Sequence, residues 1–221
     1  AGMLMTACQM ILSMHRTMHS HMCRVQRCTA NYFGKMYQPR YLSGLAAGAM
    51  TDSNKIGYVA AFPIPEVIRG INAFAAGVNE VNPDATVEVV WTFTWFGPEA
   101  ETQAANALLE TGADVLAQHQ DSAATGLAAE AAGAKWISYN TAYGQDSAPE
   151  AFVTAPVWDW GPYYVDIVES IIDGTFTTES YWGGMETGLV SLYDLSSDVP
   201  SETATLIAEK TEAIINGTLE V

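Results

Sequence analysis

Acidic residues are missing from the start of this chain, and basic residues are scarce in the rest of it. Residues 1–51 contain no Asp or Glu, whereas residues 52–221 hold all 25 acidic residues and only four of the nine Lys and Arg. The net charge of −16 therefore belongs to an acidic body. Such a body repels phosphate backbones and anionic lipid surfaces, so the sequence argues against a nucleic-acid partner and favours a neutral or cationic small solute.

Long apolar runs and the short motifs of common enzymes are also missing. No apolar run is long enough to cross a bilayer. The chain has no G-x-x-x-x-G-K-S/T loop, no G-x-G-x-x-G after a strand and no G-x-S-x-G elbow. His119 and Asp121 resemble part of an acid–base pair, but no nucleophile stands at a recognisable position beside them. We therefore predict binding without catalysis, and no cofactor.

The opening stretch, residues 1–30, differs in composition from everything that follows. It holds six of the nine Met, all three Cys and three of the four His. One hypothesis is a site for zinc or copper, with soft ligands from His15, His19, His21, Cys23 and Cys28. The C-x-x-C spacing of a structural zinc site is absent, however. A second hypothesis is a lipoprotein signal ending at Cys8 as the acylated residue, although almost no apolar core precedes it.

From Lys55 onward, short apolar runs alternate with helical patterns. Residues 55–61 (KIGYVAA) are typical of a buried strand, and apolar residues then recur at helical spacing from Val67 to Val78. Further strands are predicted at 86–94, 114–118 and 135–139, and helices at 97–112 and 123–132. This alternation is typical of βαβ units, so we predict an α/β fold with a parallel sheet and helices on both faces.

Beyond Tyr139 the pattern is less regular. A strand is predicted at 151–156, and helices at 160–173 and 201–216. One α/β lobe is therefore expected from about residue 54 onward, while a helix predicted at 32–50 is expected to belong to another part of the protein.

Ligands bind to open parallel sheets beyond the carboxyl ends of the strands. The residues that follow the predicted strands are mostly aromatic, with a few amide, carboxylate and imidazole groups. Aromatic faces stack on flat rings, and Asp and Asn read the edges of rings, so a flat heterocycle or a sugar is indicated. Structural alternatives stay open, because Trp95 and Phe96 can cover the start of a helix and Asp121 is a good N-cap residue.

Several stretches closely resemble one family, the basic membrane protein family of ABC-transporter solute-binding proteins. The similarity is carried by KIGYVAAFPIPEVIRGINAFAAGVNEVNPDATVEVVWTFTWFGPEAE, GADVLAQHQDS, VWDWGPYY and YWGGMETGLVSL, and upstream by NYFGKMYQPRYLSGLAAGAMTDSNKIGY. It covers Asn31–Val221. The resemblance implies a fold like that of type I periplasmic binding proteins, in which two α/β lobes close over a solute, and it implies a purine nucleoside or nucleobase as the ligand.

By position, the resemblance implies ligand-binding roles for Trp95 or Phe96, for the loop of His119, Gln120 and Asp121, and for Asn140 and Trp158. Phe62 and Trp160 complete the predicted site because they also follow strands. One departure concerns Asn140. Members of the family usually carry an Asp shortly after the strand that here ends at Tyr139, and we expect Asn140 to take its place, with a consequence for ligand identity or affinity.

The resemblance also divides the chain. Residues 54–221 correspond to the second ligand-binding lobe and residues 31–53 to a helix and linker from the first, so most of the first lobe and the family's C-terminal end are expected to be missing. A third hypothesis for residues 1–30 follows, namely an out-of-frame translation of the first lobe. CRVQRCT can be encoded so that the next frame gives Ala-Gly-Phe-Asn-Val-Ala-Pro, which is similar to the stretch that precedes Asn31 in the family.

The combined prediction is the solute-binding component of an ABC importer, either periplasmic or lipid-anchored outside the cytoplasmic membrane. Its partners are a purine-type solute and an ABC permease, and it touches the membrane only through an anchor or that permease. The alternative is a ligand-sensing domain of a cytoplasmic regulator, although no helix-turn-helix pattern is present. A nucleoside-processing enzyme ranks third.

Overall fold

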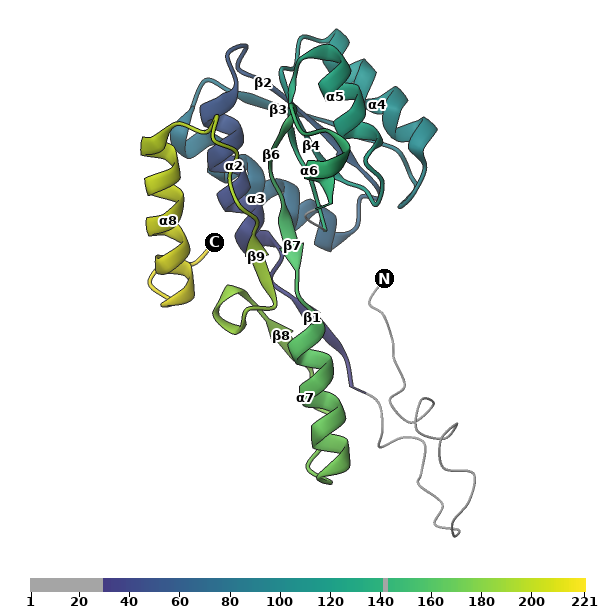
Figure 1. The fold of residues 1–221 in the computed structure, drawn as a ribbon, viewed down its shortest axis with the longest axis vertical. Helices are drawn as coiled ribbons and strands as arrows, with labels where there is room; N and C mark the ends of the chain where they lie inside the picture. Colours follow the sequence, from purple (N-terminus) through teal and green to yellow (C-terminus); the bar gives the residue numbers. More distant parts are fainter. Residues whose placement is uncertain (1–29, 141–142) are drawn as a thin grey trace.

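The computed structural model describes residues 30–140 and 143–221, and its centre is a parallel sheet of five strands (Figure 1). In spatial order the strands are β3 (Thr86–Trp91), β2 (Lys55–Ala60), β4 (Val115–His119), β5 (Lys135–Ile137) and β6 (Phe152–Thr154). The connecting helices are α3 (Pro65–Val81), α4 (Pro98–Glu110), α5 (Ala124–Ala132) and the short α6 (Gly144–Ser147). The predicted α/β class with a parallel sheet is confirmed.

Alternate side chains of the central strands enter two separate cores. Tyr58 of β2 and Ala117 of β4 belong to the core that α2 (Tyr37–Met50), α3 and α8 (Ser201–Ile215) share. Val59 and Leu116, their neighbours in sequence, belong to the core under α4 and α5. Because both faces are covered, the strands are apolar on both sides, and the two helical layers are visible on either side of the sheet in Figure 1.

Helix α3 connects the first strand of the sheet to its outer neighbour. Pro65 occupies the first turn, where its fixed φ suits a helix and its missing N–H costs nothing. Val67, Phe74 and Val78 recur on one face and are buried against the sheet and α2. Asn82 then ends the helix. The local sequence therefore determines where the chain emerges after β2, at the carboxyl-terminal edge of the sheet.

Helix α2 packs directly against α3. A Cβ at Gly44 would collide with the carbonyl of Phe74, and a Cβ at Gly77 would collide with the carbonyl of Tyr41. Glycine at both positions lets the two backbones touch. The helix that was predicted to belong to another part of the protein thus packs into the core of this α/β lobe.

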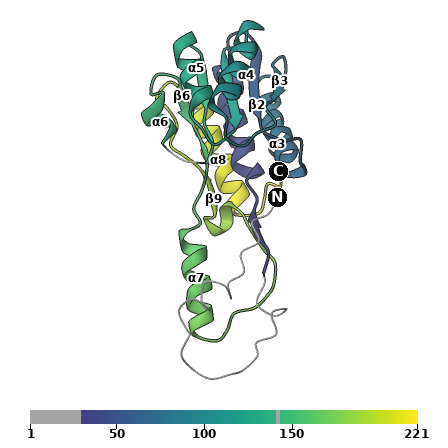
Figure 2. The same cartoon turned by 90° about the vertical axis from the view of Figure 1, so that its right-hand side faces the viewer.

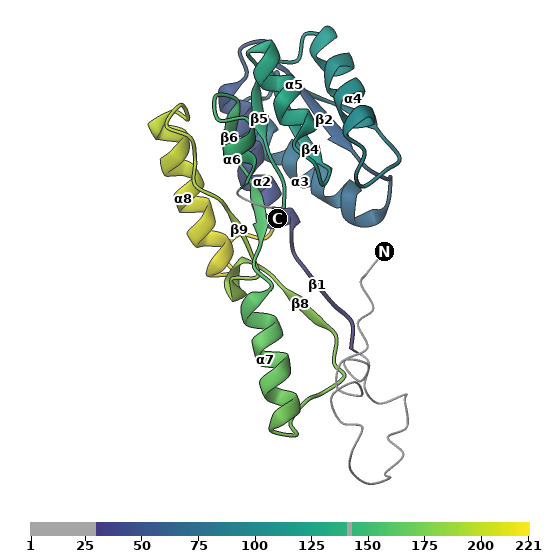
Figure 3. The ribbon, with the colours of Figure 1, turned by 45° about the vertical axis from the view of Figure 1, so that its right-hand side comes forward.

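Two short ribbons lead away from the sheet. β1 (Tyr32–Gly34) pairs in parallel with β8 (Tyr181–Gly183), and β7 (Pro156–Trp158) pairs antiparallel with β9 (Val190–Leu192). Figure 2 shows α7 (Gly161–Ile172) lying beyond the sheet, and Figure 3 shows β1 and β8 between the lobe and α7. No residue of α7 is buried. We call β1, β8 and α7 the arm. A short 3-10 helix, η2 (Met185–Thr187), follows β8.

Three element predictions need correction. The helix predicted at 32–50 begins only at Tyr37, because residues 32–34 are drawn into the ribbon with β8. The strand predicted at 86–94 ends at Trp91, because Phe93 takes a φ of +55°, which a strand does not allow. The strand predicted at 151–156 is two strands, β6 and β7, which belong to different sheets.

The hypotheses for residues 1–30 rest on Cys8, His15, His19, His21, Cys23 and Cys28, all of which lie outside the described residues. Among the helices of residues 30–140 and 143–221, none has the length and hydrophobicity that spanning a bilayer requires.

Candidate functional site

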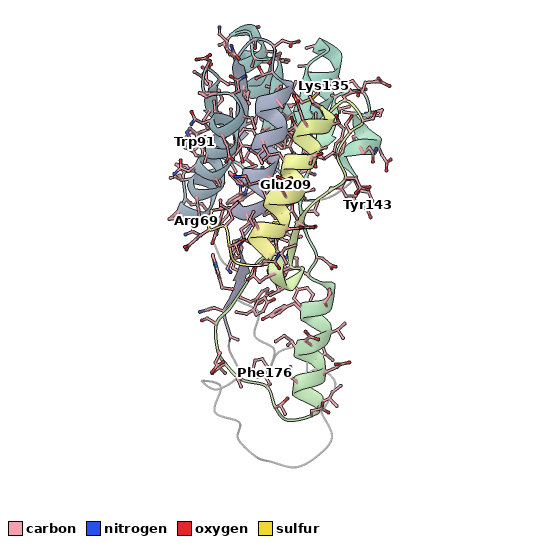
Figure 4. All side chains as sticks on the ribbon, turned by 90° about the vertical axis from the view of Figure 1, so that its left-hand side faces the viewer. Arg69, Trp91, Lys135, Tyr143, Phe176 and Glu209 are labelled. Atoms are coloured by element: carbon pink, nitrogen blue, oxygen red, sulfur yellow. The ribbon has the colours of Figure 1, made fainter. Side chains whose placement is uncertain are left out.

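A cavity of about 1470 Å³ opens at the carboxyl-terminal edge of the sheet, where the strand ends meet the arm. Its walls come from the first turn of α3, from the loops after β3, β4 and β5, and from β1, β8 and the start of α7. Figure 4 shows Arg69, in the first turns of α3, at the end of the lobe that faces the arm, whereas Lys135 lies at the opposite end. The cavity is therefore where the topology of a parallel sheet places a ligand.

Six of the nine predicted site residues line this cavity: Trp95, His119, Asp121, Asn140, Trp158 and Trp160. They come from the last residues of β4 and β7 and from the loops after β3, β4, β5 and β7, so only the fold brings them together. The rule that loops converge at one edge of the sheet correctly placed them near one another.

The other three predicted residues do not line the cavity. Phe62 packs its ring against Trp95 at 5.2 Å between centroids, and so supports a wall from behind. Phe96 is 65% exposed. Gln120 is buried and donates a hydrogen bond of 2.6 Å to the Thr92 hydroxyl, which ties the loop after β4 to the end of β3.

His119 ends β4 at the floor of the cavity. The imidazole is almost fully buried, with the ring of Tyr139 at 4.4 Å and the ring of Trp95 at 6.0 Å. Burial, and to a smaller extent the nearby guanidinium of Arg40, hold the pKa of His119 well below its usual value. The side chain is neutral at pH 7, so its 3.3 Å contact with the Glu66 carboxylate is not an ion pair.

Glu66 and Arg40 were not predicted as parts of the site. Glu66 lines the cavity from the first turn of α3, and burial raises the pKa of its carboxyl group against the opposing effect of Arg40. Arg40 lies beneath the floor, completely buried, with its guanidinium carbon 4.0 Å from the centroid of the Tyr139 ring. It donates to the carbonyl of Gln118 at 2.7 Å, which places a cation behind the end of β4.

Asp121 and Asn140 form a polar pair in the cavity wall. The amide nitrogen of Asn140 donates to the Asp121 carboxylate at 2.6 Å. Asn140 has a φ of +71°, a region that Asn tolerates better than most residues. Burial raises the pKa of Asp121, and the bond from Asn140 opposes that shift. Asp121 does not act as the N-cap of α5, which begins at Ala124, so that structural alternative is wrong.

Aromatic rings make up most of the remaining wall. Trp158 and Trp160 stack on each other, with 5.0 Å between centroids and 15° between planes. From the arm, the cavity also receives Tyr32, Phe33, Tyr164, Tyr181 and Trp182. Sequence patterns did not indicate these arm residues, because pairing between β1 and β8 joins segments far apart in the chain and only the fold reveals it.

This arrangement offers flat faces for stacking and carboxylate and amide groups for hydrogen bonding. Within residues 30–140 and 143–221, no group of three or more His, Cys, Asp or Glu side chains is arranged to hold a metal ion. The chemistry that the described groups support is recognition of a planar or ring-shaped solute.

Comparison with known proteins agrees with this geometry. Residues 26–221 match the profile of a family described as ABC transporter substrate-binding protein PnrA-like. A putative ABC transporter glucose-binding protein of Haloferax volcanii is 44% identical over 203 residues, which are 92% of this chain and 52% of the relative. A purine-binding protein of Brucella abortus is 40% identical over 189 residues, which are 83% of this chain and 52% of the relative.

The chain therefore spans about half the length of the curated relatives it matches. A solved ABC transporter solute-binding protein from Conexibacter woesei superimposes with a TM-score of 0.71 and 25% identity, covering 86% of this chain and 64% of that one. This likeness confirms that the α/β lobe and arm are folded like part of a periplasmic binding protein. On the strength of the profile match and both relatives, the chain belongs to the PnrA-like family of ABC-transporter substrate-binding proteins.

Proposed function

We propose that the protein is the solute-binding component of an ABC importer and that its solute is a purine nucleobase or nucleoside. The observation that carries this proposal is the meeting of flat aromatic rings with edge-reading groups in one cavity. Trp158 and Trp160 offer faces on which a purine ring stacks, and Asp121 and Asn140 offer an acceptor and an amide for its edge. Binding needs no bond to be made or broken.

The relatives named above are described by two solute classes, glucose and purines, so the test compares both. We would titrate the purified chain with adenine, guanosine and glucose and follow the indole N–H signals of its six tryptophans by NMR, which detects weak as well as tight binding. Purines are expected to shift the signals of Trp95, Trp158 and Trp160 and to leave that of Trp91 in place. Shifts with glucose alone would contradict the purine proposal.

Thermal unfolding gives a second readout of the same comparison. A solute at about one hundred times its dissociation constant stabilises the state that binds it by about 2.7 kcal/mol. Adenine or guanosine is expected to raise the melting temperature, and glucose at equal concentration is not.

The proposal includes a location outside the cytoplasmic membrane and an ABC permease as the partner, because both go with the role of solute-binding component. Deletion of the gene is expected to remove uptake of a labelled purine, and a plasmid copy is expected to restore it. Uptake that survives deletion would argue against the importer role.

A further inference from the structure

The carboxylate of Glu66 is a polar group of the cavity that the proposed function has not yet used. It sits in the first turn of α3, and 22% of its side chain is exposed. Within the described part of the chain, its contact at polar distance is the one between Oε2 and His119 Nε2, at 3.3 Å. No hydrogen bond of good geometry reaches either oxygen there. A carboxylate that is mostly removed from water needs such donors.

Two arginines oppose the effect of burial on this carboxylate. Burial raises the pKa of Glu66, whereas Arg40 beneath the floor and Arg69 on the rim lower it. Neither arginine forms a hydrogen bond with Glu66; Arg40 bonds to Gln118, and Arg69 lies over the ring of Trp182. The two guanidinium groups thus give a positive potential at Glu66 without forming hydrogen bonds to its carboxylate oxygens. Because His119 faces Oε2, Oε1 is left for a donor from a ligand.

Asp121 and Asn140 add further hydrogen-bond acceptors to the cavity wall. One carboxylate oxygen of Asp121 accepts from Asn140, which leaves the second oxygen and the carbonyl oxygen of the Asn140 amide available. A solute is expected to bring N–H or O–H groups to the free oxygens of Glu66 and Asp121, since an acceptor placed there would face a carboxylate oxygen with no proton between them.

We propose that Glu66 determines specificity, by accepting a hydrogen bond from an N–H group on the six-membered ring of a purine, such as the 6-amino group of adenine. The site then selects purines that carry this donor over purines of the same shape that lack it. This inference rests on the proposed function, because it assumes that a purine stacks in the cavity.

The test compares adenine with 6-methylpurine, in which a methyl group replaces the amino group at nearly constant shape. Dissociation constants come from the same tryptophan NMR titrations, for the unchanged chain and for Glu66→Gln. The unchanged chain is expected to prefer adenine by roughly 10- to 100-fold, because a hydrogen bond to a charged group is lost with 6-methylpurine. In Glu66→Gln the preference is expected to fall to about threefold or less, as the acceptor loses its charge.

The matched control is Glu99→Gln, which removes an exposed carboxylate from the same position of another helix, the first turn of α4. It is expected to keep the full preference for adenine. If Glu66→Gln does not fold, as judged from the indole signal of the buried Trp136, then Glu66→Asp withdraws the carboxylate by one methylene and is expected to reduce the preference as well.

The outcomes separate the two proposals. Equal affinity for adenine and 6-methylpurine in the unchanged chain, or an unchanged preference in the Glu66 variants, overturns the specificity role while purine binding stands. Binding of glucose with no binding of either purine overturns the proposed function itself.

Discussion

Asn140 donates its amide N–H to the carboxylate of Asp121 at 2.6 Å, across the gap between the loops after β5 and β4. The backbone of Asn140 is fixed as well, since its N–H donates to the carbonyl of Pro156 and its φ is +71°. An Asp in place of Asn140 would set two carboxylates face to face. The amide of Asn140 therefore allows the close approach to Asp121.

Asn140→Asp is expected to destabilise the protein by roughly 1 kcal/mol at pH 7. Two carboxylates at this distance raise the pKa of one of them above its unfolded value, so the pair is tolerated at low pH and the penalty grows as pH rises through the raised pKa. Urea unfolding at pH 4.5 and pH 7.5 measures this. Asn72→Asp, at an exposed position of α3, is the control and is expected to show no such trend. A penalty that is the same at both pH values would contradict the interpretation.

Replacement of Trp160 tests the aromatic wall. Because stacking on an aromatic ring is worth about 1–3 kcal/mol per base, Trp160→Leu is expected to weaken purine binding by roughly 5- to 150-fold. Trp160→Phe retains a flat face and is expected to lose much less. Phe96→Leu serves as the control, since Phe96 is exposed and does not line the cavity. If Phe96→Leu weakens binding as much as Trp160→Leu does, the cavity is not the binding site.

The contact between α2 and α3 makes opposite predictions for two glycines of one helix. A Cβ at Gly77 would collide with the carbonyl of Tyr41, so Gly77→Ala is expected to cost about 3 kcal/mol or to prevent folding. At Gly70 a Cβ would meet only side-chain atoms of Arg40, at 3.7 Å and beyond, which is ordinary contact. Gly70→Ala is therefore expected to stabilise the helix by up to about 1 kcal/mol. Chemical unfolding gives the stability of both variants. If Gly77→Ala is as stable as the unchanged chain, the close contact between the backbones of α2 and α3 is wrong.

His119 is expected to make the protein less stable at acidic pH. Its folded pKa lies well below 6.5, so below that pH the unfolded chain binds a proton that the folded chain refuses, and stability falls as pH falls. The loss reaches about 1.4 kcal/mol per pH unit at most. His119→Gln lacks this group, so its unfolding free energy is expected to fall less between pH 7 and pH 5 than that of the unchanged chain. Parallel curves would show that the imidazole titrates normally.

The sheet was predictable because its strands carry their own signals. KIGYVA and VLAQH are short, mostly apolar or small runs bounded by helical patterns, as is typical of buried parallel strands. The element predictions failed where contacts with residues far away in the sequence determine the local structure. Tyr32 has no local reason to leave a helix, and it does so because Tyr181 pairs with it. Phe93 has a high strand propensity, but its positive φ turns the chain away from the sheet.

The lining of the cavity was predictable in part. The convergence of strand ends correctly assembled His119, Asp121 and Asn140 around one cavity. Glu66 was overlooked because a Glu in the first turn of a helix has an ordinary explanation in the helix dipole. Nothing local marks Arg40 either, since its burial depends on packing between α2 and the sheet.

The pairing of β1 with β8 also sets an order of events during synthesis. The strands of the sheet find their neighbours within one or two βα units, so the five-stranded sheet of the α/β lobe can assemble as it leaves the ribosome, before α8 completes the core. Tyr32–Gly34 is made before that lobe, yet it has to wait for residues 181–183. Until then its backbone N–H and C=O groups form an open strand edge, which neighbouring nascent chains on the same messenger can reach.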